Sequence, residues 1–266
     1  MTQSASMPLV IKIGGRALED MSKLSSLFSR IATLVTERPC VIVHGGGALV
    51  DQWLQALHRP VIKEHGLRVT SKEDMPLVAG ALAGALNTQL VAAFNYHAQD
   101  ARSGKAVGVS LADADWCPLQ HDQGRGQVGT PDIARCDGAY LNQLLAAGML
   151  PVVCSVGALN DGSLANVNAD LAAAAVAAVL HAELLLLTDV DAILDTDGKV
   201  ISQITPAQGA AFILDGTVQG GMRIKLEAAL LAARVSRRST AVAAWYSDAA
   251  LTALLNGQAT ATRIYF

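Results

Sequence analysis

The stretch LVIKIGGRALED, Leu9 to Asp20, decides the fold, because it reads as a buried strand that ends in a sharp turn. Lys12 stands among apolar residues, and Gly14 and Gly15 follow after one more residue. A lysine in a buried strand is costly unless its charge is used. The sequence therefore raises the question of which negatively charged group this lysine serves at the end of the first strand.

Strand-like and helix-like segments alternate along the rest of the chain. Strands of continuous Val, Ile and Leu that alternate with helices are typical of an α/β sheet with both faces buried. The predicted strands are 8–15, 39–47, 105–111, 150–157, 183–189, 240–247 and 262–266, with a hairpin turn at 196–201, and the predicted helices are 19–36, 48–58, 75–97, 139–148, 171–182, 220–235 and 248–257.

Composition excludes several classes of protein. Of the 266 residues, 52% are hydrophobic and 16% are charged, which suits a substantial core and not a disordered chain. A net charge of −3 provides no basic face for nucleic acid. The four cysteines form no C-x-x-C pair, which favours reduced thiols over disulfides or a zinc site. The N-terminus has no signal-peptide pattern, and the most apolar run, 171–180, is shorter than the about 20 residues of a membrane span. We expect a cytoplasmic protein without membrane or nucleic-acid partners.

The unusual residues fall where the predicted strands end. In a parallel sheet, ligands bind beyond the carboxyl ends of the strands. Glycines at such turns leave backbone N–H groups available to an anion. Two of these turns close together, one of them beside a buried lysine, predict a polyanionic ligand. The segments concerned are Lys12–Gly15, His44–Gly47, Asn166–Asp170, Thr188–Asp189 and Gly220–Lys225.

Other phosphate and hydrolase motifs fit less well. The chain contains no G-x-x-x-x-G-K-[ST] sequence, and the G-x-G-x-x-G match at 124–129 follows no predicted strand and opens no helix, so a loop or hairpin is the better interpretation. A hydrolase that used His44–Gly47 as an oxyanion loop would need a G-x-S-x-G turn, for which 108–112 is a poor match. His44 itself is interpreted as a structural histidine.

Six motifs together resemble the amino acid kinase family. They are, in chain order, VIKIGG, VIVHGGG, HGLRVT, NVNAD, LLTDVDAIL and GGMRIK, and the resemblance runs from about Pro8 to Phe266. HGLRVT followed by NVNAD is similar to the acetylglutamate kinase branch. The resemblance implies an open, mostly parallel eight-stranded sheet between helices. It also implies an enzyme that uses ATP to phosphorylate the side-chain carboxylate of N-acetyl-L-glutamate, giving N-acetyl-L-glutamyl 5-phosphate in arginine biosynthesis.

The resemblance assigns roles to the catalytic residues. A carboxylate that attacks ATP is already ionised, so catalysis rests on positioning and on charge stabilisation of the transferred group. Lys12 supplies one cation beside the glycine N–H groups, Lys225 approaches the same phosphoryl group from the nucleotide side, and Asp170 matches the aspartate that organises both. An edge-strand lysine and an ordinary helix N-cap stay open as alternatives for Lys12 and Asp170.

The acyl substrate is assigned a second set of residues. Arg68 matches the arginine that pairs with a substrate carboxylate, and its planar fork suits a bidentate contact. Gly46 and Gly47 match backbone donors to this substrate. Asn166 matches a side chain that holds it, with Asn168 as a second polar contact. A surface arginine and turn-forming asparagines are the alternatives.

The nucleotide segments depart from the family pattern at two positions. Ala192 stands where the family commonly has glycine, and Gln219 where it commonly has threonine. Residues 117–137 are also irregular, which leaves the lid over the substrate undefined. Mg²⁺ is expected on the ATP phosphates, since the sequence offers no separate carboxylate cage. The expected ATP-binding residues are Gly14, Gly15, Asp189, Val190, Asp191, Ala192, Ile193, Leu194, Thr217, Val218 and Gln219.

The expected organisation has two lobes. Residues 1–170 are predicted to bind the acyl substrate and to dimerise, and residues 171–266 to bind ATP. Arginine-inhibited members of the family carry an extra N-terminal helix, whereas here seven residues precede Pro8, fewer than the about 12–15 that an isolated helix needs. We expect a homodimer without arginine feedback. Two other functions stay open, a related kinase for an aminoadipate derivative or carbamate, and a metabolite sensor without catalysis.

Overall fold

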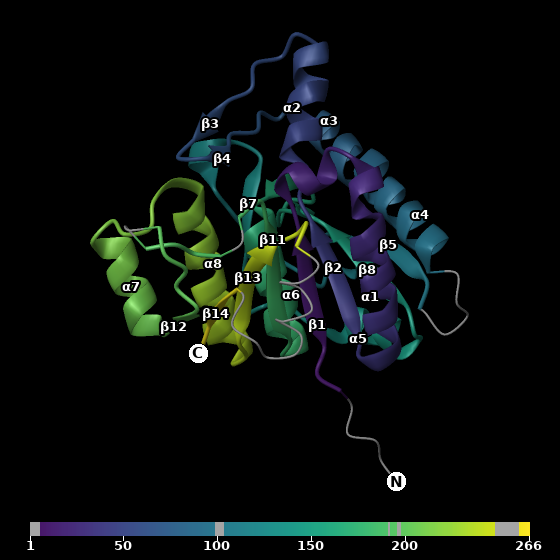
Figure 1. The fold of residues 1–266 in the computed structure, drawn as a ribbon. Coiled ribbons are helices and arrows are strands. Elements are labelled where there is room, and N and C mark those ends of the chain that lie inside the picture. The colour runs from purple at the N-terminus through teal and green to yellow at the C-terminus, as the bar shows by residue number, and fades with distance from the viewer. Residues whose placement is uncertain (1–5, 99–103, 191, 196–197, 248–260) are drawn as a thin grey trace.

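An eight-stranded sheet forms the centre of the computed structural model, which describes residues 6–98, 104–190, 192–195, 198–247 and 261–266 (Figure 1). The strand order is β12-β14-β13-β11-β1-β2-β8-β5, and of these neighbours β13 and β14 pair antiparallel while the others pair parallel. The predicted open, mostly parallel sheet is confirmed. Its strands are β1 Leu9–Ile13, β2 Cys40–His44, β5 Ala106–Ser110, β8 Leu150–Cys154, β11 Glu183–Thr188, β12 Gln203–Ile204, β13 Thr240–Ala244 and β14 Thr262–Ile264.

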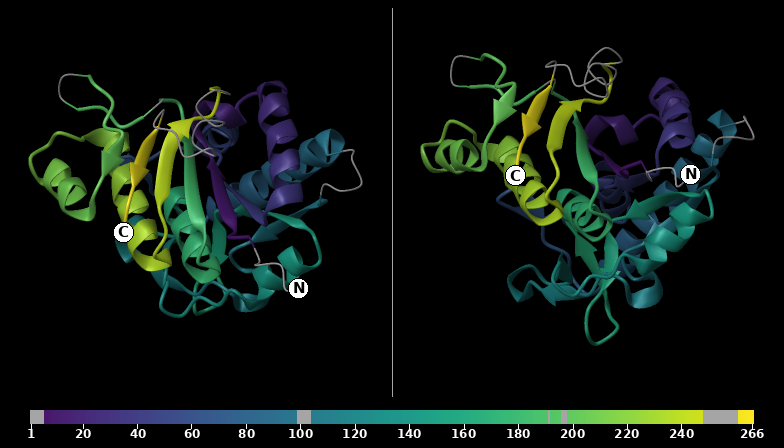
Figure 2. Two further views of the ribbon diagram at one scale, coloured as in Figure 1. Left: turned by 60° about the horizontal axis from the view of Figure 1, so that its bottom comes forward. Right: turned by 90° about the horizontal axis from the view of Figure 1, so that it is seen from below.

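Helices cover both faces of the sheet (Figure 2). α1, α2, α3 and α4 pack into the hydrophobic cluster on one face, and α5, α6 and α8 into the cluster on the other, with α7 against α8. The helices are α1 Ser25–Glu37, α2 Gly47–Ala56, α3 Met75–Ala79, α4 Asn87–His97, α5 Ala139–Ala146, α6 Ala169–Leu180, α7 Pro206–Leu214 and α8 Gly220–Ser236.

Two smaller sheets lie outside the sequence prediction. A four-stranded sheet has the order β6-β7-β10-β9, and β3 and β4 form a hairpin of their own. The segment 117–137, irregular by sequence, contains β6 and β7, and the G-x-G-x-x-G match at 124–129 covers the end of their connection and the start of β7, as a hairpin interpretation requires. Strands of two to four residues are too short to show a period. Their bounds are β3 Lys63–Glu64, β4 Leu67–Arg68, β6 Leu119–His121, β7 Val128–Pro131, β9 Val156–Ala158 and β10 Leu164–Val167.

Some helix boundaries also differ from the prediction. The helix predicted at 19–36 begins only at Ser25, after two 3₁₀ turns, because the Asp20 carboxylate accepts hydrogen bonds from the backbone and hydroxyl of Ser22 and holds a local turn. α7 was not predicted. The helix predicted at 248–257 lies outside the described residues.

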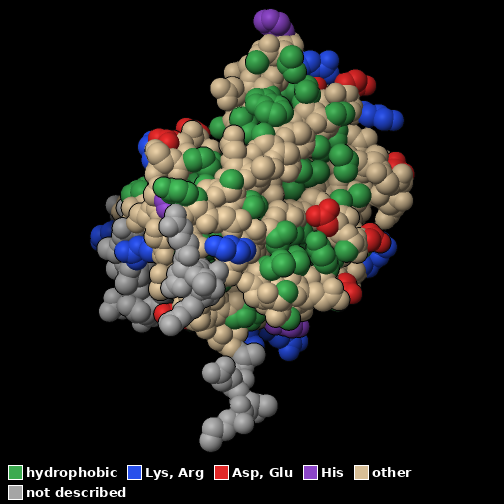
Figure 3. Space-filling view, turned by 90° about the vertical axis from the view of Figure 1, so that its right-hand side faces the viewer, with side chains coloured by type: hydrophobic (Ala, Val, Ile, Leu, Met, Phe, Trp, Pro, Cys, Tyr) green, Lys and Arg blue, Asp and Glu red, His purple; other side chains and the backbone are tan. Residues whose placement is uncertain are grey.

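The helical stretch Met75–His97 is, among the described residues, long and apolar enough to cross a membrane by length and composition alone. It joins α3 and α4 through the π-helical segment Gly80–Leu86. One side of it packs into the core, as the inner helix of a folded domain does. Figure 3 views the side of the molecule on which α4 lies and shows hydrophobic side chains gathered there. The buried residues of this stretch recur at helical spacing and include Met75, Val78, Leu82, Leu86, Leu90 and Phe94.

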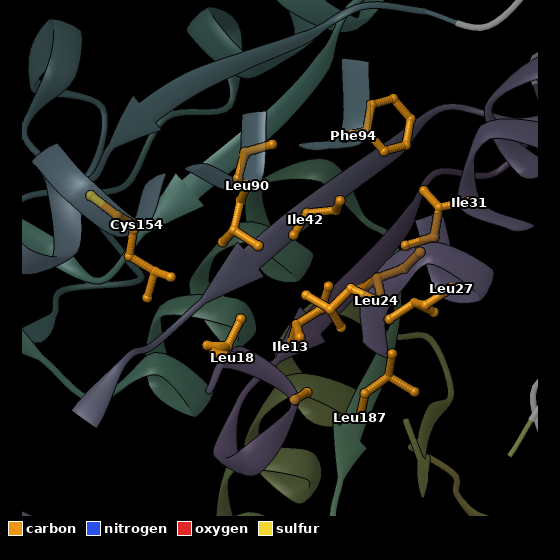
Figure 4. Close-up of a cluster of buried hydrophobic side chains, with 14 of the residues drawn as sticks. Ile13, Leu18, Leu24, Leu27, Ile31, Ile42, Leu90, Phe94, Cys154 and Leu187 are labelled. Atoms are coloured by element: carbon orange, nitrogen blue, oxygen red, sulfur yellow. The ribbon is translucent and has the colours of Figure 1, made fainter. Parts of the chain in front are cut away.

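Alternation along β1 sends its side chains into two different cores. Leu9, Ile11 and Ile13 belong to the cluster beneath α1 and α4 (Figure 4). Val10 belongs to the cluster beneath α6 and α8. The two-residue period of a strand puts Lys12 on the same side as Val10. Lys12 therefore faces α6 and α8 at the carboxyl end of the strand.

Candidate active site

A cavity of about 300 Å³ opens at the carboxyl ends of β1 and β2. These strands are parallel neighbours, so the two glycine turns that follow them meet at one edge of the sheet. The β3–β4 and β6–β7 hairpins and the segment before α6 complete the walls, and the volume suits a small-molecule ligand. Among the predicted site residues, the cavity is lined by Lys12, Gly14, Gly15, Gly46, Gly47, Arg68, Asn166 and Asn168.

Lys12, Asp170 and Lys225 form an ion cluster at this edge. The Lys12 Nζ lies 2.8 Å from Oδ1 of Asp170, and the Lys225 Nζ lies 3.4 Å from Oδ2. Their side chains are 7%, 8% and 22% exposed, in the order Lys12, Asp170, Lys225. The structure thus brings together the three residues that the sequence named for catalysis. Lys12 lies in a central strand and is buried, which excludes the edge-strand alternative.

The cluster shifts the pKa values of Asp170 and Lys225. Burial opposes ionisation of Asp170, but the ammonium groups of Lys12 and Lys225 outweigh burial and hold the pKa of this carboxyl below its usual value. Burial and then the charge of Lys12 lower the pKa of Lys225, with Asp170 acting in the opposite sense. Two ammonium groups face one carboxylate in this cluster, and of the three side chains Lys12 lines the cavity.

Asn168 fixes the start of α6 and so the position of Asp170. Its Oδ1 accepts hydrogen bonds from the backbone N–H of Asp170 at 2.9 Å and of Leu171 at 3.1 Å. The N-cap of α6 is therefore Asn168, and the N-cap alternative for Asp170 is wrong. Because the carboxylate of Asp170 is not used by the helix backbone, it is left to bind the two lysines.

His44 and Asn87 orient the second glycine turn. His44 is fully buried, with Nδ1 2.7 Å from the carbonyl oxygen of Gly45 and Nε2 3.0 Å from Nδ2 of Asn87. The Asn87 Nδ2 also donates to the carbonyl of Val152 at 2.8 Å, so Nε2 of His44 is the acceptor and Nδ1–H donates to Gly45. Burial lowers the pKa of His44 to about 4, which keeps the ring neutral.

The direction of the Gly45 carbonyl has a consequence for the cavity. In a planar trans peptide the carbonyl and the next N–H point in opposite directions. Because His44 holds the Gly45 carbonyl on its own side, the N–H of Gly46 points away from His44, and Gly46 lines the cavity. The imidazole is buried behind the turn, in agreement with the structural interpretation of His44.

Both turns require glycine. Gly15 has φ +63°, and a Cβ there would collide with the carboxylate of Asp189. Gly46 has φ +152°, and a Cβ there would collide with Leu82 and Leu86. The backbone can follow these paths at low cost only without a side chain.

Arg68 is held in place by a partner that the sequence analysis missed. Its Nη2 donates to the carbonyl of Gly47 at 3.0 Å and pairs with the carboxylate of Asp51, which also binds Nζ of Lys63 at 2.7 Å. Burial raises the pKa of Asp51, and the hydrogen bonds from Lys63 and Arg68 more than compensate and lower it. The Nη1 of Arg68 is buried and has no hydrogen-bond partner among the described residues. A buried donor without a partner is suited to a ligand carboxylate.

Other lining residues also went unnoticed in the sequence. Asp122 and Arg125, which form an ion pair of 2.7 Å, come from the connection between β6 and β7. The G-x-G-x-x-G match at 124–129 includes Arg125, but it is interpreted as a loop or hairpin and not as part of a site. Ser155 follows the end of β8, so the strand-end rule that selected the glycine turns could have found it. Asn166 lies in the wall with its Nδ2 3.4 Å from the hydroxyl of Thr70.

Asp189 connects the cavity edge to the nucleotide segments. It follows β11, beside Gly15, and its Oδ1 accepts a hydrogen bond from Nε1 of Trp245 at 2.9 Å. Val190 and Leu194 are exposed, whereas Ala192 and Ile193 are buried in the core. The predicted residue Asp191 lies outside the described residues.

The second nucleotide segment lies before α8. The hydroxyl of Thr217 donates to the Asp215 carboxylate at 2.7 Å, and Nε2 of Gln219 donates to the carbonyl of Gly216 at 2.8 Å. Val218 is buried. None of these three residues lines the cavity of the described structure. Their link to it is α8 itself, which carries Lys225 in its second turn.

Comparisons with known proteins cover almost the whole chain. The sequence pattern of the amino acid kinase family matches residues 7–244. An acetylglutamate kinase of Colwellia psychrerythraea is 46% identical over 259 residues, which are 97% of this chain and 96% of that protein. An acetylglutamate kinase of Pectobacterium atrosepticum is 42% identical over 260 residues, 97% of this chain and 98% of that one. The fold of an N-acetylglutamate synthase from Neisseria gonorrhoeae, solved with coenzyme A and N-acetyl-glutamate, matches with a TM-score of 0.81 at 22% identity, over 98% of this chain and 60% of that one.

Proposed function

Because this chain belongs to the amino acid kinase family, we propose that it transfers the γ-phosphoryl group of ATP to the side-chain carboxylate of N-acetyl-L-glutamate. The product is N-acetyl-L-glutamyl 5-phosphate, an intermediate of arginine biosynthesis made in the cytoplasm. The observation that carries the proposal is the buried Lys12–Asp170–Lys225 cluster beside a cavity with glycine turns, in a chain 46% identical to an acetylglutamate kinase.

The proposed reaction is a direct in-line transfer. The substrate carboxylate is ionised and needs no general base, so the protein has to bring two anions together and stabilise the charge on the transferred phosphoryl group. Lys12 and Lys225 supply this charge from the two sides, and the Asp170 carboxylate between them offsets their mutual repulsion. The N–H groups of the glycine turns at Gly14–Gly15 and Gly46–Gly47 add fixed donors.

The acyl substrate occupies the cavity of about 300 Å³ in this proposal. The Nη1 of Arg68 binds the carboxylate that does not react, and the Asp51 ion pair holds the guanidinium in place. The side chains of Asn166 and Asn168 bind the rest of the substrate, and Asn168 uses its amide nitrogen because its oxygen caps α6.

ATP is proposed to bind next to the cavity, along the ends of β1, β11 and α8. The side chains of Ala192, Ile193 and Val218 are in the core. The N–H and carbonyl of Ile193 and the N–H of Val218 already form hydrogen bonds within the protein, so the backbone of Ala192 and the carbonyl of Val218 are the groups offered to the nucleotide. Mg²⁺ comes on the ATP phosphates. Within the described residues no three His, Cys, Asp or Glu side chains gather as a metal site, and Asp170 and Asp189 are engaged by lysines and by Trp245. The metal neutralises phosphate charge when bound.

A coupled assay of ADP release tests the function. ATP and Mg²⁺ are combined with N-acetyl-L-glutamate, N-acetyl-L-aminoadipate, carbamate or no acceptor, and hydroxylamine traps the acyl phosphate as a hydroxamate. We expect ADP and hydroxamate with N-acetyl-L-glutamate, formed about 10²–10³-fold more slowly by the Lys12→Ala control. Preference for aminoadipate or carbamate would support another kinase of the family, and binding of N-acetyl-L-glutamate without turnover would support a sensor.

The assembly proposed for this enzyme is a homodimer built on the N-terminal lobe, 1–170, with ATP bound by the C-terminal lobe, 171–266. β5 ends the order of the main sheet, and α4 packs beside it. The Met75–His97 stretch exposes small residues every four positions, at Gly80, Gly84, Thr88 and Ala92. Small residues let two helices approach closely, and a two-fold dimer is the commonest assembly of soluble enzymes.

A further inference from the structure

A pair of cysteines lies in contact away from the proposed active site. The sulfurs of Cys117 and Cys136 are 3.5 Å apart, although the residues are separated by β6 and β7 in the chain. Both thiols are reduced in the structure. A disulfide requires a sulfur–sulfur distance of about 2.05 Å, so a shift of roughly 1.5 Å would join them.

The backbone holds the two cysteines in this arrangement. The N–H of Asp137 donates to the carbonyl of Trp116 at 2.8 Å, and the N–H of Asp132 donates to the carbonyl of Pro118 at 2.9 Å. These two hydrogen bonds flank the sulfur pair, one on each side along the chain. The segments that carry the thiols therefore stay together without the covalent bond.

The two thiols differ in access. Cys117 is 2% exposed, whereas Cys136 is partly exposed and lines a second cavity of about 320 Å³. This cavity lies near the carboxyl end of α6, with Val179 and His181 in its wall, whereas Asp170 lies at the opposite end of the helix. A small oxidant can reach Cys136 there without entering the cavity of the kinase site.

We propose that Cys117 and Cys136 are a modification site that hydroperoxides convert to a reversible disulfide. The Cys136 thiolate attacks an oxygen of hydrogen peroxide, the O–O bond breaks, and the products are a Cys136 sulfenic acid and hydroxide. The Cys117 sulfur then attacks the sulfenic sulfur, its proton goes to the departing hydroxyl, and water leaves. In total the two thiols lose two electrons and one hydrogen peroxide is reduced to two waters, because the hydroxide takes up the proton that Cys136 released on ionising.

The directions in which the two pKa values are shifted agree with this order of attack. The hydrogen bond with the Cys117 thiol lowers the pKa of Cys136, against burial and the negative charge of Asp132, while the pKa of Cys117 is raised by the same contact and by burial. Cys136 is thus the thiol that ionises first, and thiolates are the nucleophiles toward peroxide.

The bond would close a loop that contains the β6–β7 hairpin, whose connection lines the kinase cavity at Asp122 and Arg125. The kinase reaction has no part in forming it, so this inference does not depend on the proposed function. Reduction by a dithiol, through thiol–disulfide exchange, restores both thiols.

Peptide mapping after peroxide treatment tests the proposal. The full chain is reduced, freed of reductant, exposed to a few equivalents of hydrogen peroxide, alkylated under denaturing conditions and digested. We expect one cross-linked peptide pair joining Cys117 to Cys136, 2 Da lighter than the two thiol peptides, and its loss after dithiothreitol. A rise in Tm of about 5 °C is expected to accompany the cross-link, because closing the loop restricts the unfolded chain.

Cys40 and Cys154, which are both 1% exposed, serve as internal controls. We expect them to remain thiols during peroxide treatment and so to be alkylated afterwards. Cys117→Ser should let dimedone capture a sulfenic acid at Cys136, whereas Cys136→Ser should leave Cys117 as a thiol. Both cysteines remaining thiols while a free-thiol standard is oxidised would overturn the proposal. So would dimedone capture at Cys117 in the Cys136→Ser variant, or oxidation spread equally over all four cysteines.

Discussion

Lys12 has the burial of a core residue and the charge of a surface residue. The two-residue period of β1 turns it toward α6, where Asp170 lies 2.8 Å away. Removal of one partner from a buried ion pair commonly destabilises a protein by about 3–5 kcal/mol. Asp170 therefore contributes both to folding and to the charge balance of the site, whereas each lysine can be removed with the other still paired to Asp170.

Removal of either lysine is predicted to impair chemistry more than folding. Lys12→Ala and Lys225→Ala should each lower kcat by about 10²–10³-fold, the scale for one preorganised charge-stabilising donor. Steady-state kinetics with ATP and N-acetyl-L-glutamate measure the loss, and thermal melts check that the fold persists. A variant that turns over at the parental rate would remove its lysine from the catalytic set.

Lys225 should also set a basic limit to activity. Its pKa is lowered from 10.5 by burial and by Lys12, so its positive charge is lost as pH rises through a value below 10.5. We expect kcat/KM to decline on this basic limb, because that ratio reports groups of the free enzyme. Lys225→Arg, which stays charged, should move the limb to higher pH. An unshifted limb in this variant would assign the decline to another group.

Arg68 is predicted to act on the acyl substrate and not on ATP. In the native protein Nη2 of Arg68 binds Asp51 and Gly47, which leaves Nη1 for a ligand. Arg68→Lys keeps the positive charge but cannot make both sets of contacts at once. The KM for N-acetyl-L-glutamate should rise far more than the KM for ATP. Equal rises in both KM values would mean that Arg68 stabilises the fold and does not bind the acyl substrate specifically.

At the scale of elements, the turn between β2 and α2 depends on the tautomer of His44. The side-chain nitrogen of asparagine can take the position of Nδ1 and donate to the Gly45 carbonyl. The side-chain nitrogen of the longer glutamine takes the position of Nε2 instead and leaves the Gly45 carbonyl without this donor. We predict that His44→Asn keeps most of kcat and that His44→Gln lowers it by about 10²-fold, the scale of a misplaced reacting group.

The same pair of variants has two checks. Circular dichroism and thermal melts should show both folded, and neither the parent nor His44→Asn should show a kcat inflection near pH 6.5, since the pKa of His44 is about 4. Equal kinetics in the two variants would show that the turn holds its shape without the hydrogen bond to Gly45.

The sequence predicts the longer strands of the fold and misses the short ones. β1, β2 and β11 are buried apolar runs of five or six residues, so composition alone marks them, and the glycines that follow mark the site edge. β3 and β4 have two residues each and carry no period, yet they bring Lys63 and Arg68 to the cavity. The contacts of Asp51 and Asn87 depend on helices packing across the fold, which no local pattern encodes.

At the scale of the whole molecule, one continuous sheet supports both proposed lobes. β1 pairs with β2 on the acyl side and with β11 on the nucleotide side, so Lys12 lies on the strand they share. The boundary at residue 170 falls in the first turn of α6. The site therefore needs a single protomer, and a dimer would add stability without completing it.

A substitution on the proposed dimer face is predicted to separate assembly from activity. A Cβ at Gly84 meets nothing within 4 Å, so Gly84→Arg should fold, yet its side chain would block close helix contact. Light scattering should give a dimer for the parent and a monomer for the variant, with kcat retained. Ala210→Arg, on the exposed side of α7, is the control and should stay dimeric. A monomeric parent, or a dimeric Gly84→Arg, would place the interface elsewhere or nowhere.

The glycine turns have an evolutionary consequence. The donors of these turns are backbone amides, which only a change to proline removes outright, and any larger residue at Gly15 or Gly46 meets a steric clash. Both positions are thereby restricted to glycine. A change of the substrate that accepts the phosphoryl group would therefore proceed through side chains such as Arg68 and Arg125, which line the cavity from the two short hairpins. A substitution there alters which substrate binds and leaves the glycine turns unchanged.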